Sequence, residues 1–423
     1  MNLSIPYGHG KQTATWHFSS YEVLEPQKAS AGDPDNLIAE AMARPICSPT
    51  LQELAAGKKN AVIIISDHTR PVPSKQILPP MLKALRDASA QIDITLLVAT
   101  GCHRKTTRAE LAEKLGEEIL RTEKIVIHNC DDTAGMVCLG TLPSGAELWV
   151  NRIAADTQLL LAEGFIEPHF FAGFSGGRKS VLPGICARRT AMSNHCAKLI
   201  DDPRSRTGIL SGNPIHADME AAAKMAKLQY IVNVLLDGNK QIIHAVAGDP
   251  QAAHNEGCRI MGQLAGVHPR KAGDIVVTSN GGAPLDQNMY QVVKSLSTAE
   301  AAAAEGGDII VCAECADGIG GAQFYRAMRE CASPSALLRE ILLIPPEETV
   351  PDQWQYQILC RTLEKHRILF VTEARLAEAV TDMKMTYCAS LEDALSLASQ
   401  NHPDGHAVII PDGVGTMCIS ENP

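Results

Sequence analysis

Gly164-Phe-Ile-Glu-Pro-His-Phe-Phe-Ala-Gly-Phe-Ser-Gly-Gly-Arg-Lys-Ser180 is the most informative stretch of this chain. It combines a histidine, His169, with closely spaced glycines and the cationic pair Arg178 and Lys179. Because glycine lets the backbone approach a ligand closely, such a loop can bring peptide N–H groups and a lysine amine together. The apolar run 159–162 just before it predicts a strand. Ligands of open α/β sheets bind beyond the carboxyl ends of strands, so the segment predicts a binding site.

The same order of strand, loop and helix recurs along the chain. Helices are predicted from about Ser74, from near Thr107 and over 287–305, each after a short β-branched run. This alternation is typical of mainly parallel sheets flanked by helices. We therefore predict two α/β domains, with the active site in the cleft between them. The predicted strands are 61–65, 92–99, 159–162, 274–278, 308–312, 368–372 and 407–411.

The length of 423 residues also favours two domains over one core. Turn-forming residues at 266–273 mark the predicted boundary. We expect a cofactor-binding N-terminal domain over residues 1–268 and a C-terminal α/β domain over 273–406. The last strand could complete either sheet, so residues from about 407 to 423 could return to the first domain.

The composition excludes several classes of protein. A net charge of −10 argues against a general nucleic-acid or anionic-membrane binder, although a pocket for a small anion needs only one or two cations. Thirteen irregularly spaced cysteines do not form the pattern of a disulfide framework. The first ten residues show no signal peptide, and no apolar run has transmembrane length. We expect a cytoplasmic protein.

Two short motifs are incomplete matches to known functional patterns. Gly173–Ser180 resembles a Walker loop, but Arg178 stands where that loop requires glycine, which disfavours an ATPase. Cys312 and Cys315 form a single Cys-x-x-Cys without the second pair that a zinc site needs. We expect these two cysteines to lie in the core.

Histidines recur at the predicted strand-end loops. His68, His103, His169 and His195 each follow or flank such a loop. Histidine titrates near neutral pH and binds metals as a neutral base, so these residues could be ligands, general bases or both. Asp67 could orient a neighbouring imidazole by accepting its N–H.

Two cations are candidates for binding a carboxylate. Arg70 follows the first strand, and Lys294 lies on the helix predicted over 287–305. Tyr290 and Lys294 share a helix face because they are four residues apart, with Gln291 adjacent. As surface cations they would have no role, but together in one site they could clamp a carboxylate.

These segments, taken together, resemble the nickel-pincer lactate racemase family. The matches occur in order over most of the chain, and the central one is long enough to be specific. They are Ser66–Ser74, Gly101–Lys105, Glu167–Gly184 with Asn194 and His195, Ser279–Asp286 with Tyr290, Gln291 and Lys294, and Asp352–Gln355.

The resemblance implies a covalently bound cofactor. The family carries a nickel-pincer nucleotide, Ni(II) pyridinium-3-thioamide-5-thiocarboxylic acid mononucleotide, which is made by dedicated enzymes and joined to a lysine. Lys179 stands at the position of that lysine and His195 at that of the nickel ligand. The positions of the paired catalytic bases are held by His103 and His169.

The remaining site residues also follow from the resemblance. Arg70, Lys294, Gln291, Tyr290 and Trp354 correspond to substrate contacts. The expected cofactor-binding residues besides Lys179 are Asp67, Thr69, Ser175, Gly176 and Gly177.

The implied chemistry suits a racemase or epimerase of 2-hydroxy acids. The α-hydrogen of such an acid is very weakly acidic, so a hydride acceptor avoids a carbanion. Two bases are needed because the hydroxyl group points to different sides in the two antipodes, and histidines near neutral pKa serve both directions. Lactate is the first candidate substrate. The alternatives are a metal-dependent hydrolase using the same histidines and a phosphate-binding module without catalysis.

Overall fold

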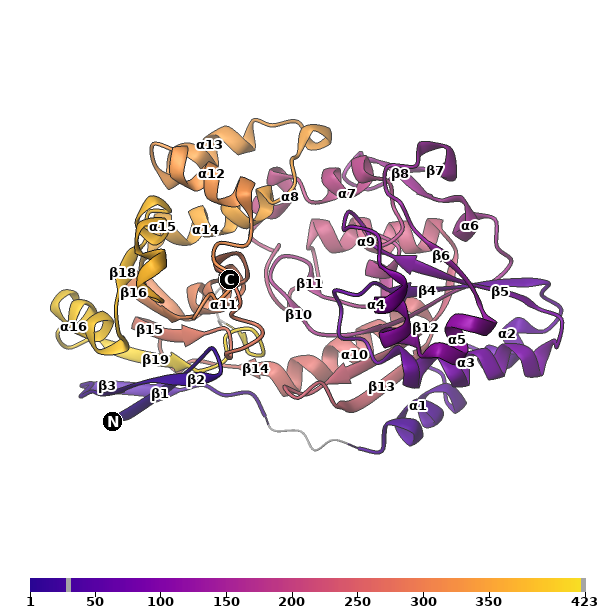
Figure 1. The fold of residues 1–423 in the computed structure, drawn as a ribbon, viewed down its shortest axis with the longest axis horizontal. Helices are drawn as coiled ribbons and strands as arrows, with labels where there is room; N and C mark the ends of the chain where they lie inside the picture. The colour runs from indigo at the N-terminus through magenta and orange to yellow at the C-terminus, as the bar shows by residue number, and fades with distance from the viewer. Residues whose placement is uncertain (28–31, 420–423) are drawn as a thin grey trace. The chain divides into compact units, whose positions relative to one another are not determined.

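The computed structural model describes residues 1–27 and 32–419, and they form two compact units (Figure 1). Unit 2 comprises Lys28–His195 and Ile209–Gln263. Unit 1 comprises Met1–Gln27, Cys196–Gly208 and Leu264–Pro423. Each unit is an α/β structure with a mainly parallel sheet flanked by helices, as the sequence predicts.

The sheet of unit 2 has six strands in the order β13-β12-β9-β4-β5-β6. All neighbours are parallel except β12 and β13, which form an antiparallel edge pair. The central strands β4, β5 and β9 match the three apolar runs expected from the sequence. The strands are β4 (Asn60–Ser66), β5 (Asp93–Ala99), β6 (Lys124–Ile127), β9 (Leu160–Phe165), β12 (Leu228–Leu236) and β13 (Ile242–Gly248).

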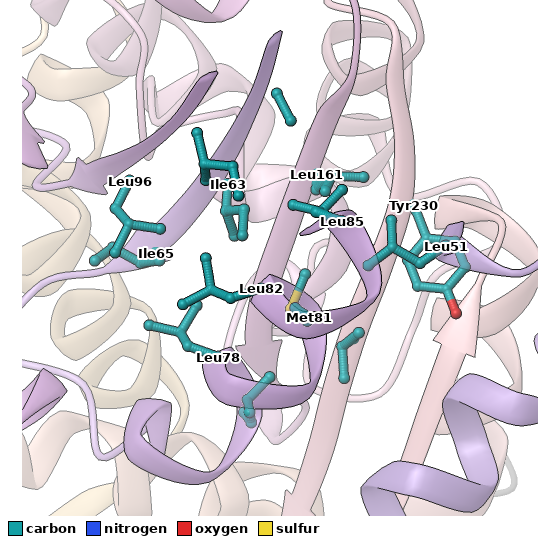
Figure 2. Packing of buried hydrophobic residues seen from close by; sticks show 14 of the residues in the cluster. Leu51, Ile63, Ile65, Leu78, Met81, Leu82, Leu85, Leu96, Leu161 and Tyr230 are labelled. Atoms are coloured by element: carbon teal, nitrogen blue, oxygen red, sulfur yellow. The ribbon is translucent and has the colours of Figure 1, made fainter. Parts of the chain in front are cut away.

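One face of this sheet is covered by a cluster of apolar side chains (Figure 2). Helix α3 (Ser74–Ala88) contributes Leu78, Met81 and Leu85, whose three- and four-residue spacing places them on one face of the helix. All three are fully buried. They pack with alternate residues of the strands, such as Ile63, because successive strand side chains point to opposite faces.

Short helices complete the layers of unit 2. The 3₁₀ turn η2 (Gly177–Ser180) packs on β9, β4 and helix α9 (Pro214–Met225). Two short antiparallel pairs, β7 (Met136–Thr141) with β8 (Glu147–Asn151) and β10 (Pro168–His169) with β11 (Gly173–Phe174), lie outside the main sheet. The other helices are α1 (Pro34–Ala43), α2 (Leu51–Ala55), α4 (Arg108–Leu115), α5 (Glu117–Thr122), α6 (Arg152–Ala155), α7 (Arg188–Asn194) and α10 (Pro250–Ala265).

The sheet of unit 1 is parallel throughout, in the order β18-β17-β16-β15-β19-β3. Its strands are β3 (Ser20–Val23), β15 (Gly273–Ser279), β16 (Ala303–Cys312), β17 (Arg367–Val371), β18 (Thr386–Cys388) and β19 (His406–Ile410). Its helices are α8 (Ala197–Asp201), α11 (Met289–Ala302), α12 (Ala322–Glu330), α13 (Pro334–Leu342), α14 (Gln353–Lys365), α15 (Ala377–Asp382) and α16 (Leu391–Asn401).

The two ends of the chain differ from the expected domain organisation. Strand β19, which could have joined either sheet, lies between β15 and β3 in unit 1. The chain's first strands, drawn in indigo in Figure 1, belong to unit 1 as well, and not to an N-terminal domain of residues 1–268. The reason is burial: Leu3 and Ile5 of β1 (Asn2–Tyr7), paired with β2 (Gly10–Thr15), lie in the core beneath β15 and β16.

Two further expectations from the sequence concern the cysteines and the helices. Cys312 and Cys315 are fully buried core residues, as predicted. All thirteen cysteines fall in the described ranges, and each is a free thiol. Among the helices of residues 1–27 and 32–419, none combines the length and apolar character needed to cross a bilayer.

The close packing of the cluster in Figure 2 predicts that a cavity made within it lowers the free energy of unfolding. Leu78→Ala should lower the free energy of unfolding by about 2–5 kcal/mol, because the side chain is fully enclosed. Urea unfolding followed by circular dichroism measures this change. Leu343→Ala is the control, since Leu343 is 84% exposed and should change stability little. Equal effects of the two substitutions would contradict this account of the core.

Candidate active site

The candidate residues of unit 2 lie on loops that follow three neighbouring strands, β9, β4 and β5. From β4 the chain builds β5 and β6 on one side, and it later returns to build β9 and β12 on the other. Loops after β4 and β9 therefore diverge at a topological switch point, where open α/β sheets bind their ligands. Asp67 and Arg70 follow β4, His103 follows β5, and His169 and Lys179 follow β9.

Asp67 orients the His103 ring through a hydrogen bond. Its Oδ2 lies 2.7 Å from His103 Nδ1, and its Oδ1 accepts a 2.6 Å hydrogen bond from the Thr69 hydroxyl. Burial raises the pKa of Asp67, but the hydrogen bonds from His103 and Thr69 outweigh burial and leave this pKa below its ordinary value. An ionised Asp67 only accepts, so His103 donates to it from Nδ1, and in the neutral form of the ring the lone pair is on Nε2.

The other two polar residues of the β4 loop behave differently. Arg70 is exposed, and its charge acts on both Asp67 and Lys179. His68 instead lies 3.1 Å from the Thr106 hydroxyl through its Nδ1, at the start of α4.

His169, Lys179 and His195 surround one aromatic ring, that of the buried Phe171. The Phe171 ring centroid lies 4.6 Å from that of His169, 5.1 Å from that of His195 and 5.8 Å from Lys179 Nζ. Lys179 Nζ is also 3.3 Å from His169 Nε2. The sequence drew attention to the glycines of this loop and missed Phe171, because one phenylalanine among several carries no chemical signal.

The surroundings of Lys179 disfavour its charged form. The Ala172 N–H donates to His169 Nδ1 at 3.3 Å, and the other ring nitrogen of His169, Nε2, faces Lys179 Nζ. Burial, with the charges of Arg178 and Arg70, holds the pKa of Lys179 well below its ordinary value.

The same surroundings suit a metal bound through nitrogen. Burial above all lowers the pKa of His195 to about 3, so its imidazole is neutral and keeps on one ring nitrogen the lone pair that a metal ligand needs. Imidazole is a good ligand for nickel, and an uncharged amine can form an amide-type bond. The donor set thus fits a nickel cofactor linked to Lys179. No group of three or more His, Cys, Asp or Glu placed to hold a metal occurs within residues 1–27 and 32–419.

Arg178 points into the protein, away from the role suggested by its pairing with Lys179. It is 3% exposed and donates to the carbonyls of Ala172 and Phe174, each at 2.8 Å. Its Nε donates to His216 Nδ1 at 3.0 Å, and its Nη1 lies 2.9 Å from His254 Nε2. One buried guanidinium therefore holds the carbonyls of the loop that presents Lys179.

The glycines of the loop serve its shape. Gly176 and Gly177 have φ of 77° and 50°, and a Cβ on Gly177 would lie 2.7 Å from the His254 ring. The Gly177 N–H donates to Asn233 Oδ1 at 2.8 Å, and the Ser175 hydroxyl donates to the Phe165 carbonyl at 3.0 Å. These groups bond to residues of strands β12 and β9, and their contact with a cofactor stays a prediction.

The unit 1 candidates lie on two helices that pack together, α11 and α14. Tyr290, Gln291 and Lys294 are on α11 and are each partly exposed. Trp354 is at the start of α14, whose Gln355 donates through Nε2 to the Tyr290 carbonyl. Unit 1 therefore holds four of the five predicted substrate contacts within one helix pair, and the fifth, Arg70, belongs to unit 2.

Comparison with known proteins identifies the family. Residues 7–208 match the model of the lactate racemase N-terminal domain, and residues 268–418 match that of the lactate racemase C-terminal domain. The chain is 45% identical to lactate racemase from Thermoanaerobacterium thermosaccharolyticum over 421 residues, covering 98% of this chain and 99% of that protein. It is 46% identical to lactate racemase from Lactiplantibacillus plantarum over 381 residues, covering 90% of each.

Comparison with solved structures supports the same family assignment. The lactate racemase apoprotein from T. thermosaccharolyticum matches with a TM-score of 0.95 and 45% identity, covering 99% of this chain and 100% of that one. A Thermotoga maritima protein, 17% identical, matches with a TM-score of 0.63 over 93% of this chain and 100% of its own, which shows the fold alone.

The fold is that of a two-unit α/β protein, and the candidate catalytic groups of unit 2 lie on strand-end loops. The chain belongs to the lactate racemase family. It is accordingly an isomerase of the racemase class.

Removing the buried Arg178 charge should destabilise the protein. Arg178→Met leaves several loop carbonyls without a donor, at about 1–3 kcal/mol for each one that stays buried. The expected loss in the free energy of unfolding is on the order of 3 kcal/mol or more, measured by urea denaturation. Arg121→Met, at an exposed arginine of α5, is the control and should lie within about 0.5 kcal/mol of the parent.

The lowered pKa of Asp67 predicts that its contribution to the stability of the fold depends on pH. Its folded-state pKa is lowered, so the carboxylate stabilises the fold above its unfolded pKa, about 3.9, and this contribution is lost as pH falls through the folded value. Asp67→Asn should be less stable than the parent at pH 7, and the difference should shrink below about pH 4. Thermal unfolding of both proteins across pH measures it. A difference independent of pH would contradict the ionised state of Asp67.

Proposed function

We propose that this protein racemises a 2-hydroxy acid, with lactate as first candidate, using a nickel-pincer nucleotide joined covalently to Lys179. The observation that carries the proposal is the buried Lys179 amine, which lies 3.3 Å from His169 Nε2 and beside the ring that also contacts His195, and whose pKa is held well below its ordinary value. A lowered pKa favours the uncharged amine that forms an amide-type bond, and a surface lysine would be charged at neutral pH. The family's racemase activity supports the proposed reaction.

The residues have separate tasks towards the cofactor. Lys179 would supply the covalent link and His195 a nitrogen ligand to nickel. When bound, the cofactor supplies a hydride acceptor for the α-carbon of the substrate. Arg178, although it lies next to Lys179 in the chain, keeps the loop in shape from within. Cofactor-making enzymes are therefore required partners of this chain.

His103 and His169 are proposed as the two proton-transfer bases. His103 presents a bare Nε2, because Asp67 holds the proton on Nδ1. It would accept the hydroxyl proton of one antipode, and His169, on the loop after β9, would serve the other. Thr69 would keep Asp67 oriented through its hydroxyl hydrogen bond.

The carboxylate of the substrate needs a cation. Arg70 is exposed on the loop that carries Asp67, and a guanidinium can bind a carboxylate through two hydrogen bonds. Tyr290, Gln291, Lys294 and Trp354 are proposed as further substrate contacts. Their grouping on α11 and α14 supports a common role.

The first experiment tests the covalent link. The protein is produced with the cofactor-making enzymes, and its intact mass and metal content are measured. We expect an added mass that maps to Lys179, together with nickel. Lys179→Arg, which cannot form the link, should keep the fold and lose the adduct. An unmodified Lys179 in active, nickel-containing protein would refute the proposal.

The second measurement is a chiral assay of the holoenzyme on lactate and other 2-hydroxy acids. His103→Ala and His169→Ala should each lose about 10²–10⁴-fold in kcat, the usual contribution of a general base, while keeping the adduct. His268→Ala, at an exposed histidine, should keep full activity. Full activity of either catalytic-site variant would exclude a scheme with two bases.

A further inference from the structure

The loop between β4 and α3 is fastened at both ends by one buried carboxylate. Glu163, near the end of β9, is 2% exposed. Its Oε1 accepts from the Ser66 N–H at 3.2 Å and from the Ser74 hydroxyl at 2.8 Å. Ser66 is the last residue of β4 and Ser74 the first of α3. A single oxygen thus joins the two ends of the loop that carries Asp67 and Arg70.

The middle of the same loop is fastened by a lysine from another helix. Lys114, in the last turn of α4, donates through Nζ to the Arg70 carbonyl at 3.1 Å and to the Val72 carbonyl at 3.4 Å. The start of α4 is fixed by a capping box between Thr107 and Glu110. The amine therefore comes from a helix whose own position is defined.

Charge links the two fastening groups. Burial lowers the pKa of Lys114, and the negative charges of Glu163 and Asp67 oppose that effect. Burial likewise raises the pKa of Glu163, opposed first by the charge of Lys114. Each group makes the charged form of the other less costly beneath the loop.

Arg70 depends on this arrangement more than its neighbours do. Asp67 is oriented by its own side-chain bonds to Thr69 and His103. The Arg70 side chain is exposed, so its reach is set by its main chain, and Lys114 binds the carbonyl of that main chain. Proper placement of a binding group within about 0.5 Å requires such support from surrounding residues.

We propose that Lys114 is a positioning residue that, together with Glu163, sets the place of Arg70 and thereby the affinity for the substrate carboxylate. The proposal rests on the proposed function through the role of Arg70. We expect Lys114 to act on binding more than on proton transfer, because its hydrogen bonds are to main-chain carbonyls of the loop.

The test is steady-state kinetics of the holoenzyme. Lys114→Met removes the donor at nearly constant length. We expect KM for the 2-hydroxy acid to rise about tenfold, as expected for the loss of a charged hydrogen-bond donor, with kcat changed less than about threefold. Lys83→Met is the matched control, since Lys83 is an exposed lysine of α3 paired with Asp87, and it should keep parental KM and kcat. A parental KM for Lys114→Met would overturn the positioning role.

A double substitution shows whether Lys114 acts through Arg70. Arg70→Met alone should raise KM, and Lys114→Met added to it should raise KM no further. Multiplied effects in the double variant would mean that the residues act independently and would overturn the proposal. An unchanged KM in Arg70→Met would instead contradict the carboxylate-binding role within the proposed function, so the two failures are distinguishable.

Hydrogen exchange of the protein without cofactor gives a readout that is independent of activity. Lys114→Met should speed exchange of the peptide 66–74, while Lys83→Met should not. If Lys114→Met does not fold, Lys114→Gln, which keeps a shorter donor, replaces it and should show the same direction of change. Glu163→Gln keeps the accepting Oε1, so hydrogen exchange of the peptide 66–74 should be nearly that of the parent. Glu163→Leu removes the acceptor, so exchange should be faster at both ends of the loop. Unchanged exchange in Lys114→Met and Glu163→Leu would overturn the fastening of the loop.

Discussion

The loop that carries Lys179 depends on the hydrogen bonds of the buried Arg178 guanidinium. A buried charge is costly unless hydrogen bonds satisfy it, and here main-chain carbonyls and two imidazoles do so. Its Nε donates to His216, whose Nε2 lies 3.3 Å from Glu220. Besides burial, the positive charge of Arg178 opposes protonation of the adjacent Lys179. The group that shapes the loop therefore also helps to lower the pKa of its lysine.

The two sheets use their switch points differently. In unit 2 the loops after β4 and β9 present polar side chains, with Phe171 packed among them. In unit 1 the loop after β15 packs instead on the turn of the β1–β2 hairpin. There the Gly8 N–H donates to Asp286 Oδ2 at 2.6 Å, and the Ala283 N–H donates to the Gly8 carbonyl at 2.8 Å. The switch point thus carries the candidate site in unit 2 and a packing contact in unit 1.

Sequence reasoning located what depends on local pattern. The apolar runs that became β4, β5, β9 and β15 lie where the alternation predicts them, and the strand-end loops follow at once. Asp67 with His103, and His169 with Lys179, are brought together as the loop positions imply.

Contacts between residues that are far apart in the chain could not be predicted from local sequence patterns. Glu163 and Lys114 each meet the loop after β4 from other elements, at separations in the chain of 97 residues for Ser66–Glu163 and 44 for Arg70–Lys114. Nothing in their immediate neighbours signals burial. The placement of residues 1–27 in unit 1 also depends on pairing with β19, almost at the other end of the chain. The inward direction of Arg178 depends on His216 and His254 in the same way.

The pairing of β3 with β19 also sets the order in which the molecule can be completed during synthesis. Unit 2 needs nothing beyond Gln263, so the segments bearing His103, His169, Lys179 and His195 can fold while the ribosome is still making the rest. Strand β3 must wait for a partner that begins at His406. At about 5–20 residues per second, that interval is roughly 20–80 s. Throughout it, the first strands of the chain have an unpaired edge, and the nascent protein must keep that edge from other strands.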